Sequence, residues 1–427
     1  MPVRKELCFP QRTIMTPGPV EADPRVLRAM GAPIIGQFDP AFTDIMNETM
    51  QMLRELFETE NRWAYPIDGT SRAGIEAVLA SVIEPGDSVL VPIYGRFGYL
   101  LTEIAERYGA DVHTMECEWG TVFRPEDIIS EMKKVHPKIV AMVHGETSTG
   151  RIHPLKEIGE ACRAQNALFI VDAVATIGGC AVKTDEWKID AVIGGTQKCL
   201  SVPSGMAPIT YNDRTAKVIA ARKKVERGIA TEVDGVRFSD HRPITSNYFD
   251  LSQLEDYWSE RRLNHHTEAT TMLYALREGV RLVLEEGLDE RFRRHRRHEE
   301  ALAAGLEAMG LVLFGGPECK LPVVTCVQIP QEADENLSGV CCCRNLVLKL
   351  PARSDRSQEK YGGSGQWATA AERKMYCLCW PDSKLFSSGM MFPSKRAKRC
   401  RRRLMHMTCQ LKQRELNSLR YIAVIRP

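Results

Sequence analysis

The chain has 427 residues, of which 44% are hydrophobic and 26% are charged. This composition predicts a globular protein of one large domain or two ordinary ones, and it excludes a low-complexity chain. No apolar run approaches the roughly 20 residues that cross a bilayer, and the N-terminus lacks the apolar segment of a secretory signal. We therefore expect a cytoplasmic protein with no membrane partner.

Short apolar runs alternate with amphipathic patterns through the first half of the chain. Strands are predicted at residues 88–93, 111–117, 138–146, 167–175, 190–196 and 206–212. Helices are predicted at residues 72–83, 98–109, 124–135 and 155–165. The alternation indicates an α/β fold with a mainly parallel sheet covered by helices. Ligands of such sheets bind beyond the carboxyl ends of the strands, where the loops converge.

A second domain is predicted near residue 280. Helical patterns occupy residues 266–286 and 288–309, and a strand pattern occupies residues 323–330. The predicted organisation is an N-terminal arm (1–23), a large domain (24–280), the start of a smaller C-terminal α+β domain (281–336) and a tail (337–427). The seven cysteines before the tail have no CxxC spacing, so we expect reduced thiols and no metal site.

An acid and a lysine follow two successive predicted strands. Asp172 ends the run ALFIVD, where its apolar surroundings make a charge costly unless a cation meets it. Lys198 lies two residues beyond the next strand, among small residues in GGTQKCLSVPSG. Taken singly, a strand-end aspartate is more often a turn former, and a loop lysine is more often solvated. Together, both side chains can face one crevice at the edge of the sheet.

Two further segments bring hydroxyl and amide groups to the same edge. The segment DGTSRAGIEAVL has Gly, Thr and Ser directly before a helix, a place where backbone N–H groups hold a phosphate, although such a turn is often only a helix cap. HGETSTG adds hydroxyls after the third strand. A phosphate cradle, an acid and a lysine are what pyridoxal phosphate requires: the lysine forms a Schiff base with its aldehyde, and the acid keeps its pyridine nitrogen protonated.

At this point the sequence resembles the class V (fold type I) pyridoxal-phosphate aminotransferases, in the alanine–glyoxylate and serine–pyruvate branch. The resemblance runs from MTPGPV (15–20) to VVTCVQIP (323–330), and HGETSTG, VDAVATIGG and GGTQKCLSVPSG are specific together. It implies a seven-stranded large domain. It also implies that Lys198 is the catalytic Schiff-base lysine and that Asp172 pairs with the pyridine nitrogen.

The resemblance implies the remaining cofactor contacts as well. The phosphate would be surrounded by Thr70, Ser71, Arg72 and Gln197. Phe97 would stack on the cofactor ring with Val174 on the opposite face, and Thr147 or Ser148 would bond its polar edge. Thr267 resembles the residue that reaches the phosphate from the neighbouring subunit, which implies a homodimer with shared active sites.

Two amides narrow the expected substrate. The branch usually has Tyr in the motif that here reads LNHHTEA, with Asn264, and the N-terminal segment GQFDPAF has Gln37. An amide pair suits a donor with its own ureido group, because that group has donors and acceptors to be matched in a buried site. The pattern is similar to the members that use (S)-ureidoglycine of purine (allantoin) catabolism as donor. Glyoxylate would accept the amino group and leave as glycine.

Other functions stay open at this stage. A related aminotransferase could use alanine or serine as donor. A class V cysteine desulfurase would need a reactive cysteine on a C-terminal loop, and none is placed recognisably. From a different class, the run SKRAKRCRRR (394–403) could bind nucleic acid through its charge, although such runs are usually tails on unrelated domains.

The composition changes abruptly after residue 336. Residues 337–427 hold 19 Lys and Arg but only 5 Asp and Glu, and they contain 7 of the 14 cysteines. Family members should have a motif like WRIGTMGYS in the small domain, whose arginine holds the substrate carboxylate with two hydrogen bonds. That motif is missing here, so the chain is expected to be impaired as an enzyme.

A shifted reading frame accounts for the missing motif. Joining the third base of each codon to the first two of the next, from Tyr361 to Tyr376, permits WRIGTMGYSCRKENV. The arginine codon would span Gly362 and Gly363. The same offset from Ser338 to Pro351 permits RSMLLSEFGIEIA, an amphipathic helix and strand. We therefore predict that the tail from about residue 337 is frame-shifted and poorly packed or disordered.

Overall fold

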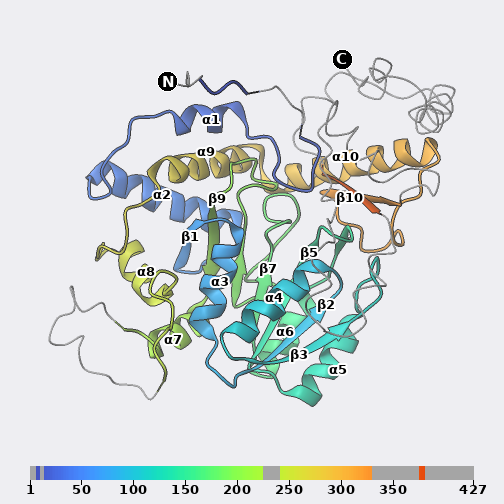
Figure 1. Cartoon of the computed structure of the whole chain (residues 1–427), viewed down its shortest axis with the longest axis horizontal. Helices are drawn as coiled ribbons and strands as arrows, with labels where there is room; N and C mark the ends of the chain where they lie inside the picture. The colour runs from blue at the N-terminus through green and yellow to red at the C-terminus, as the bar shows by residue number, and fades with distance from the viewer. Residues whose placement is uncertain (1–5, 10–13, 225–240, 329–374, 380–427) are drawn as a thin grey trace, which may run out of the picture.

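The computed structural model describes residues 6–9, 14–224, 241–328 and, for the backbone alone, 375–379. The fold is built around a seven-stranded sheet with helices packed on its faces (Figure 1). The strands follow the order β1 (Trp63–Gly69), β9 (Gly205–Tyr211), β8 (Ala191–Ile193), β7 (Leu168–Asp172), β4 (Ile139–Val143), β2 (Ser88–Ile93) and β3 (Asp111–Glu116).

The sheet is parallel from β8 to β3, and β9 is antiparallel to both of its neighbours. Every residue of β4, β7 and β8 is buried. Central parallel strands are covered on both faces, which is why these runs are continuously apolar in the sequence. The carboxyl ends of β7 and β8 are therefore adjacent, since Asp172 pairs in register with Ile193.

The helices belong to two groups. The first group connects strands of the sheet or follows β9. It consists of α3 (Ser71–Val82), α4 (Arg96–Arg107), α5 (Pro125–Val135), α6 (Lys156–Ala164), α7 (Asp213–Ala221) and α8 (Leu251–Trp258). The others, which lie along the top of Figure 1, are α1 (Pro24–Met30), α2 (Pro40–Leu56), α9 (Thr270–Glu286) and α10 (Leu288–Ala308). Asp23 and Asp39 cap α1 and α2, each followed by a proline whose fixed φ suits the first helical turn.

The predicted strands and helices of the large domain are confirmed, with differences at their ends. The run 138–146 divides into β4 and the short β5 (Gly145–Glu146), which pairs with β6 (Arg151–Ile152). The sequence analysis did not identify β1, an edge strand whose pattern is interrupted by Pro66. The long helix α9 continues across residue 280, and α10 begins at Leu288.

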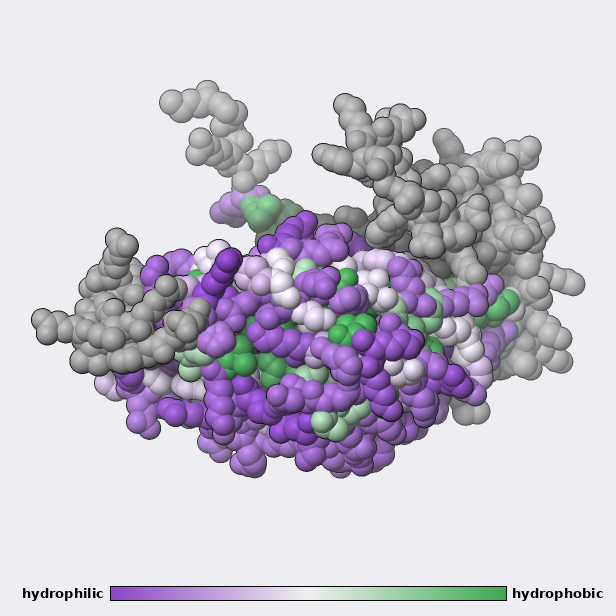
Figure 2. Space-filling model, turned by 90° about the horizontal axis from the view of Figure 1, so that it is seen from below, coloured by the Kyte–Doolittle hydropathy of each residue, from purple (hydrophilic) through white to green (hydrophobic). Residues whose placement is uncertain are grey.

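The C-terminal part of the described chain is small. β10 (Val324–Gln328) pairs antiparallel with β11 (Met375–Cys379), so five residues of the predicted tail form a strand. The rest of the tail lies outside the described residues, as does the basic run 394–403. No helix in the described ranges is long and apolar enough to cross a membrane. The face opposite α1 and α9 is mostly hydrophilic, with scattered apolar side chains (Figure 2).

Candidate active site

Lys198 lies in the loop that follows β8, covered by the N-terminal arm. Its Nζ donates a hydrogen bond to the Pro17 carbonyl. A side chain at Gly18 would lie 2.5 Å from that nitrogen, so only glycine lets the arm pass this closely. The arm is fixed beside the lysine because the Val20 N–H donates to the Gln197 carbonyl at 3.1 Å. The lysine amine therefore lies in a confined, partly buried place.

Asp172 is the last residue of β7, and its side chain is only 4% exposed. Burial, with a smaller contribution from the negative charge of Glu146, raises the pKa of this carboxyl to about 7, and a hydrogen bond from the Val174 N–H and the charge of Lys198 oppose the rise. The Val174 N–H donates to Oδ1 at 2.9 Å. The carboxylate thus requires a cationic partner to ionise fully, as predicted for an acid in this position.

The N-terminus of α3 faces the same edge of the sheet. Thr70 is its N-cap but forms no capping hydrogen bond with its side chain, so its hydroxyl is available to a ligand. The buried Ser71 hydroxyl donates to Gln197 Oε1 at 2.9 Å, which joins this helix end to the residue before Lys198. Arg72 is exposed on the first turn. Backbone N–H groups at such a helix end are a ready site for a phosphate.

Glu146 connects the loop after β4 with the start of α4. It is fully buried, and its carboxylate accepts hydrogen bonds from the Phe97 N–H at 2.8 Å and from the Ser148 N–H and hydroxyl at 2.9 and 2.6 Å. The Arg96 N–H donates in turn to Ser148 Oγ at 2.9 Å. These bonds fix the position of Phe97, the predicted stacking residue. The neighbouring Thr147 is buried, and its carbonyl faces Cys326 Sγ.

Val174 packs closely against the loop that follows β8. A side chain at Gly195 would lie 2.7 Å from Val174 Cγ1 and 2.4 Å from Ser71 Oγ. Glycine is therefore required for this loop to approach both residues closely. The close packing joins the loop after β7, the loop after β8 and the start of α3 into one wall.

The two predicted amides are in contact, in a second group of residues. Gln37 Nε2 donates to Asn264 Oδ1 at 3.0 Å, and Gln37 Oε1 accepts from the Glu268 N–H at 2.8 Å. Asp68, which lies directly before the turn that leads to Thr70, joins this group to the first. Its carboxylate accepts a hydrogen bond from the Ala269 N–H at 3.1 Å. Thr267 is exposed at the surface of the segment.

Three residues of the candidate site were not predicted from the sequence. Glu146 stands inside HGETSTG, where only the hydroxyls had been considered, and its acidic side chain within an apolar strand end was the available signal. Pro17 and Gly18 lie in the resembling segment MTPGPV, but nothing in the sequence indicated that they contact Lys198.

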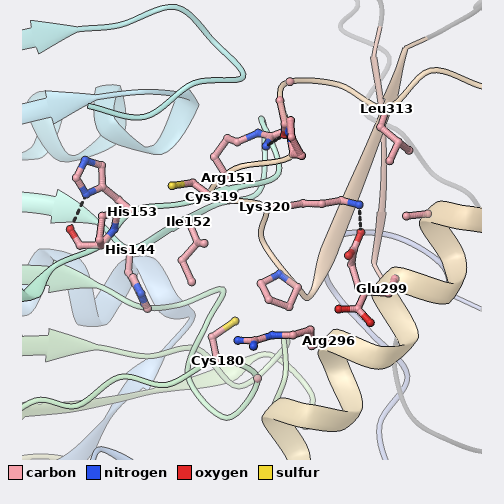
Figure 3. Close-up of a pocket in the computed structure, with 18 of the residues that line it drawn as sticks. His144, Arg151, Ile152, His153, Cys180, Arg296, Glu299, Leu313, Cys319 and Lys320 are labelled. Carbon is pink, nitrogen blue, oxygen red and sulfur yellow. Dashed lines mark hydrogen bonds and ion pairs between the residues drawn. The ribbon is translucent and has the colours of Figure 1, made fainter. Parts of the chain in front are cut away.

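A separate cavity of about 1220 Å³ lies between the β5–β6 hairpin and α10. Cys180 and Arg296 point into it from opposite walls, and Lys320 pairs with Glu299 at its side (Figure 3). Lys198 and Asp172 are not among its lining residues. The lysine and the acid lie instead beneath the N-terminal arm and the loops at the sheet edge, so the cavity is distinct from the candidate site.

Comparisons with known proteins agree with this geometry. The chain is 83% identical over 331 residues to the (S)-ureidoglycine–glyoxylate transaminase of Bacillus subtilis (strain 168), which covers 78% of this chain and 80% of that protein. It is 34% identical over 337 residues to the alanine–glyoxylate aminotransferase of Drosophila melanogaster, covering 78% of this chain and 81% of that protein.

Two solved structures show the same fold. The ureidoglycine–glyoxylate aminotransferase of Bacillus subtilis superposes with a TM-score of 0.74 at 77% identity, over 80% of this chain and 84% of that one. The alanine–glyoxylate aminotransferase of Nostoc sp. gives a TM-score of 0.77 at 32% identity, over 95% and 97%. The family model of the class V aminotransferases matches residues 29–345. The chain belongs to the class V aminotransferases, enzymes that transfer amino groups.

Proposed function

We propose that this protein transfers the amino group of (S)-ureidoglycine to glyoxylate, giving glycine, with pyridoxal 5′-phosphate as its cofactor. The observation that carries the proposal is the convergence of Lys198, Asp172 and the open N-terminus of α3 at one edge of the sheet. The similarity to the Bacillus subtilis transaminase supports the choice of substrates.

The residues present fit this cofactor. The buried Asp172 carboxylate lacks a full cationic partner, and a protonated pyridine nitrogen would supply one. The N-terminus of α3, with Thr70, Ser71, Arg72 and Gln197, would hold the phosphate. Phe97 and Val174 would pack on the two ring faces, and Thr147 or Ser148 would contact the polar edge. When bound, pyridoxal phosphate would serve as the electron sink for cleavage of a C–H bond at the donor's Cα.

The chain's own groups would perform the remaining work. Lys198 Nζ would hold the cofactor and, once released by the donor's amine, would move the proton from the donor's Cα. Asp172 would keep the ring nitrogen protonated. Glu146 would position Phe97 and Ser148 through the three hydrogen bonds that it accepts. The arm at Pro17 and Gly18 would limit the access of water to the lysine.

The amide pair would select the donor. Gln37 and Asn264 each retain a donor or an acceptor beyond the bond they share, and a ureido group offers both. The structure places Gln37 half-buried and Asn264 exposed, not in the buried site expected from the sequence, and a donor that lacks a ureido group would make fewer hydrogen bonds with them. In a homodimer, the exposed Thr267 would approach the phosphate site of the partner subunit. The assembly and the role of Thr267 are part of this proposal.

We further propose that residues from about 337 onward are read in a shifted frame. The match to the Bacillus subtilis enzyme covers 331 residues, 78% of this chain, and the change in charge and cysteine content follows residue 336. The substrate carboxylate would then lack the arginine predicted at the Gly362–Gly363 junction, and activity would be weak. Resequencing the gene tests this: an uninterrupted frame through the tail would overturn it.

The choice of donor is tested by comparing ureidoglycine, alanine and serine as donors to glyoxylate, with glycine as the measured product. We expect the largest kcat/KM for ureidoglycine. Gln37→His with Asn264→Tyr should lower kcat/KM for ureidoglycine by about 10–100-fold and for alanine much less. Gln51→His, at an exposed glutamine of α2, is the matched control. An equal loss for both donors would mean that the amides only support the fold.

A further inference from the structure

Three side chains with metal-binding atoms meet beside the amide pair, outside the residues assigned to the cofactor. They are Asp68, His266 and Glu268, and one ligand atom of each lies within 4.8 Å of the others. His266 Nε2 is 3.2 Å from Asp68 Oδ2 and 3.8 Å from Glu268 Oε2. Ligands of a divalent ion bound at about 2.0–2.2 Å in a tetrahedron are about 3.4 Å apart, so the spacing fits such an ion.

The two acids of this cluster differ in their surroundings: Asp68 is half-buried and accepts a hydrogen bond from the Ala269 N–H, whereas Glu268 is buried. Glu268 is 4% exposed, and neither of its carboxylate oxygens accepts a hydrogen bond. Asp68 Oδ1 accepts no hydrogen bond, His266 Nε2 faces one oxygen of each carboxylate, and the buried Tyr257 hydroxyl lies beside Glu268. Such groups are stable in a fold when a cation or a proton joins them.

The neighbouring histidine orients the ring of His266 toward the cluster. His265 Nε2 lies 3.4 Å from the Asn247 carbonyl, which can only accept, so this nitrogen carries the hydrogen. His265 Nδ1 is then an acceptor, and His266 Nδ1, at 2.8 Å, is the donor. His266 Nε2 therefore presents its lone pair to the two carboxylates unless it takes a second proton. A histidine fixed by a hydrogen bond from its other nitrogen is the usual arrangement in metal sites.

A second proton on His266 would compensate this cluster only in part. It would pair with Asp68 at 3.2 Å, whereas Glu268, at 3.8 Å, lies beyond normal hydrogen-bond distance. The Glu268 carboxyl would then have no ionic partner beside the rings of Tyr257 and Tyr248, whose centroids lie 4.9 and 5.6 Å from the centroid of the His266 ring. A divalent ion neutralises both carboxylates at once and binds the lone pair of the imidazole.

We propose that Asp68, His266 and Glu268 form a binding site for a divalent transition-metal ion of the Mn²⁺ or Zn²⁺ class. One nitrogen and two carboxylate oxygens are a donor set that these ions accept. The ion joins β1 to the segment before α9. The ion thereby fixes the position of Glu268, whose N–H donates a hydrogen bond to Gln37. It also fixes the backbone of the segment that carries Asn264, the hydrogen-bond partner of Gln37. Its role is structural support of the amide pair, and it is independent of the cofactor chemistry.

The test is a titration of the full-length, chelator-treated protein with MnCl₂, followed by electron paramagnetic resonance. Mn²⁺ is the probe because the cysteine thiols prefer Zn²⁺. We expect one tightly bound Mn²⁺ per chain, with nitrogen hyperfine coupling in the pulsed spectrum. Glu268→Gln and Asp68→Asn should weaken binding by more than 100-fold, since loss of an outer-shell partner alone costs about 10–100-fold. His266→Gln should also remove the nitrogen coupling.

Two controls distinguish this site from surface binding and from misfolding. His113→Gln removes an exposed histidine that lies 3.4 Å from Asp111, and it should leave Mn²⁺ binding unchanged. Glu268→Gln preserves the side-chain shape and removes a buried charge, so its metal-free melting temperature should not fall. Mn²⁺ should raise that temperature only in proteins with the intact cluster. Absence of tight Mn²⁺ binding, or equal binding by all variants, would mean that the cluster holds a proton instead.

Discussion

The two halves of the candidate site differ in where their residues come from. The strand-end half (Lys198, Asp172 and Glu146) comes from loops at the carboxyl ends of adjacent strands of one sheet. The amide half (Gln37 and Asn264) joins two distant segments through the Gln37 side chain, which donates to Asn264, 227 residues away, and accepts from the Glu268 N–H. The order of the strands sets the positions of the residues in the first half. In the second half, the positions depend on how α2, α9 and the segments that precede these helices pack together.

This difference has a consequence for function. Displacing the strand-end half requires disrupting a sheet whose central strands are fully buried. The amide half lies on partly exposed segments, so its residues can change without loss of the fold. We infer that the strand-end half determines the reaction and the amide half determines the donor. Substitutions in the two halves should therefore have effects of different kind and size.

The largest effect is expected for Lys198→Ala. Removing the only amine assigned to proton transfer should lower kcat by at least 10²–10⁴-fold for all donors alike, since general acid–base catalysis contributes about that much. The variant should also lose the visible absorbance of the lysine-bound cofactor. Lys183→Ala, at an exposed lysine paired with Glu186, is the control and should retain full activity. A borohydride-stable link to cofactor in Lys198→Ala would assign the reaction to another lysine.

Asp172→Asn should lower activity by about 10²–10³-fold, the usual cost of losing one electrostatic contact to the reacting group. Without cofactor the same change should stabilise the protein at pH 8. The folded pKa of about 7 exceeds the usual 3.8, so the folded state binds more protons, and wild-type stability falls as pH rises from about 4 to 7. The asparagine variant lacks this loss. Melting temperatures of the cofactor-free wild type and variant at pH 5 and 8 measure this loss of stability. An equal pH dependence of the melting temperature in both proteins would contradict the prediction.

The sequence indicated most of the strand-end half because its motifs are contiguous. An acid that ends a buried strand and a lysine that follows the next one identify a sheet edge, and parallel topology brings them together. Lys198, Asp172 and the hydroxyls before α3 were predictable for this reason. The distances between these groups depend on how the loops pack, and the hydrophobic periodicity of the sequence carries no information about loop packing. The contact of the N-terminal arm with Lys198 joins residues 181 positions apart and had no local signal.

The cluster beside the amide half shows why the remainder could not be predicted. His266 and Glu268 are two residues apart in the sequence, a pattern common on surfaces, and Asp68 lies about half a chain away on an edge strand. Only the pairing of β1 with β9 and the hydrogen bond from Ala269 to Asp68 bring them together. The resemblance to the family identified the two amides, but it did not predict that their side chains contact each other.

The smallest effect is expected for Glu146→Gln, which tests whether a positioning residue also sets the charge of the strand-end half. The amide has one acceptor oxygen, so it cannot accept from both the Phe97 and Ser148 N–H groups. One hydrogen bond to a charged group is worth about 1.5–3 kcal/mol, and we expect a fall in kcat/KM of roughly 10–100-fold, with KM for the donor little changed.

The pH dependence of this variant separates its two roles. The negative charge of Glu146 raises the pKa of Asp172, so its removal should move that pKa below about 7. The fall in cofactor-free stability with rising pH should then end at a lower pH than in the wild type. Glu131→Gln, at a half-buried residue of α5 that pairs with Lys134, is the control. If the variant is less active but its stability profile keeps the wild-type midpoint, Glu146 acts only through the placement of Phe97 and Ser148, and the pKa of Asp172 is set by burial, the Val174 N–H and Lys198.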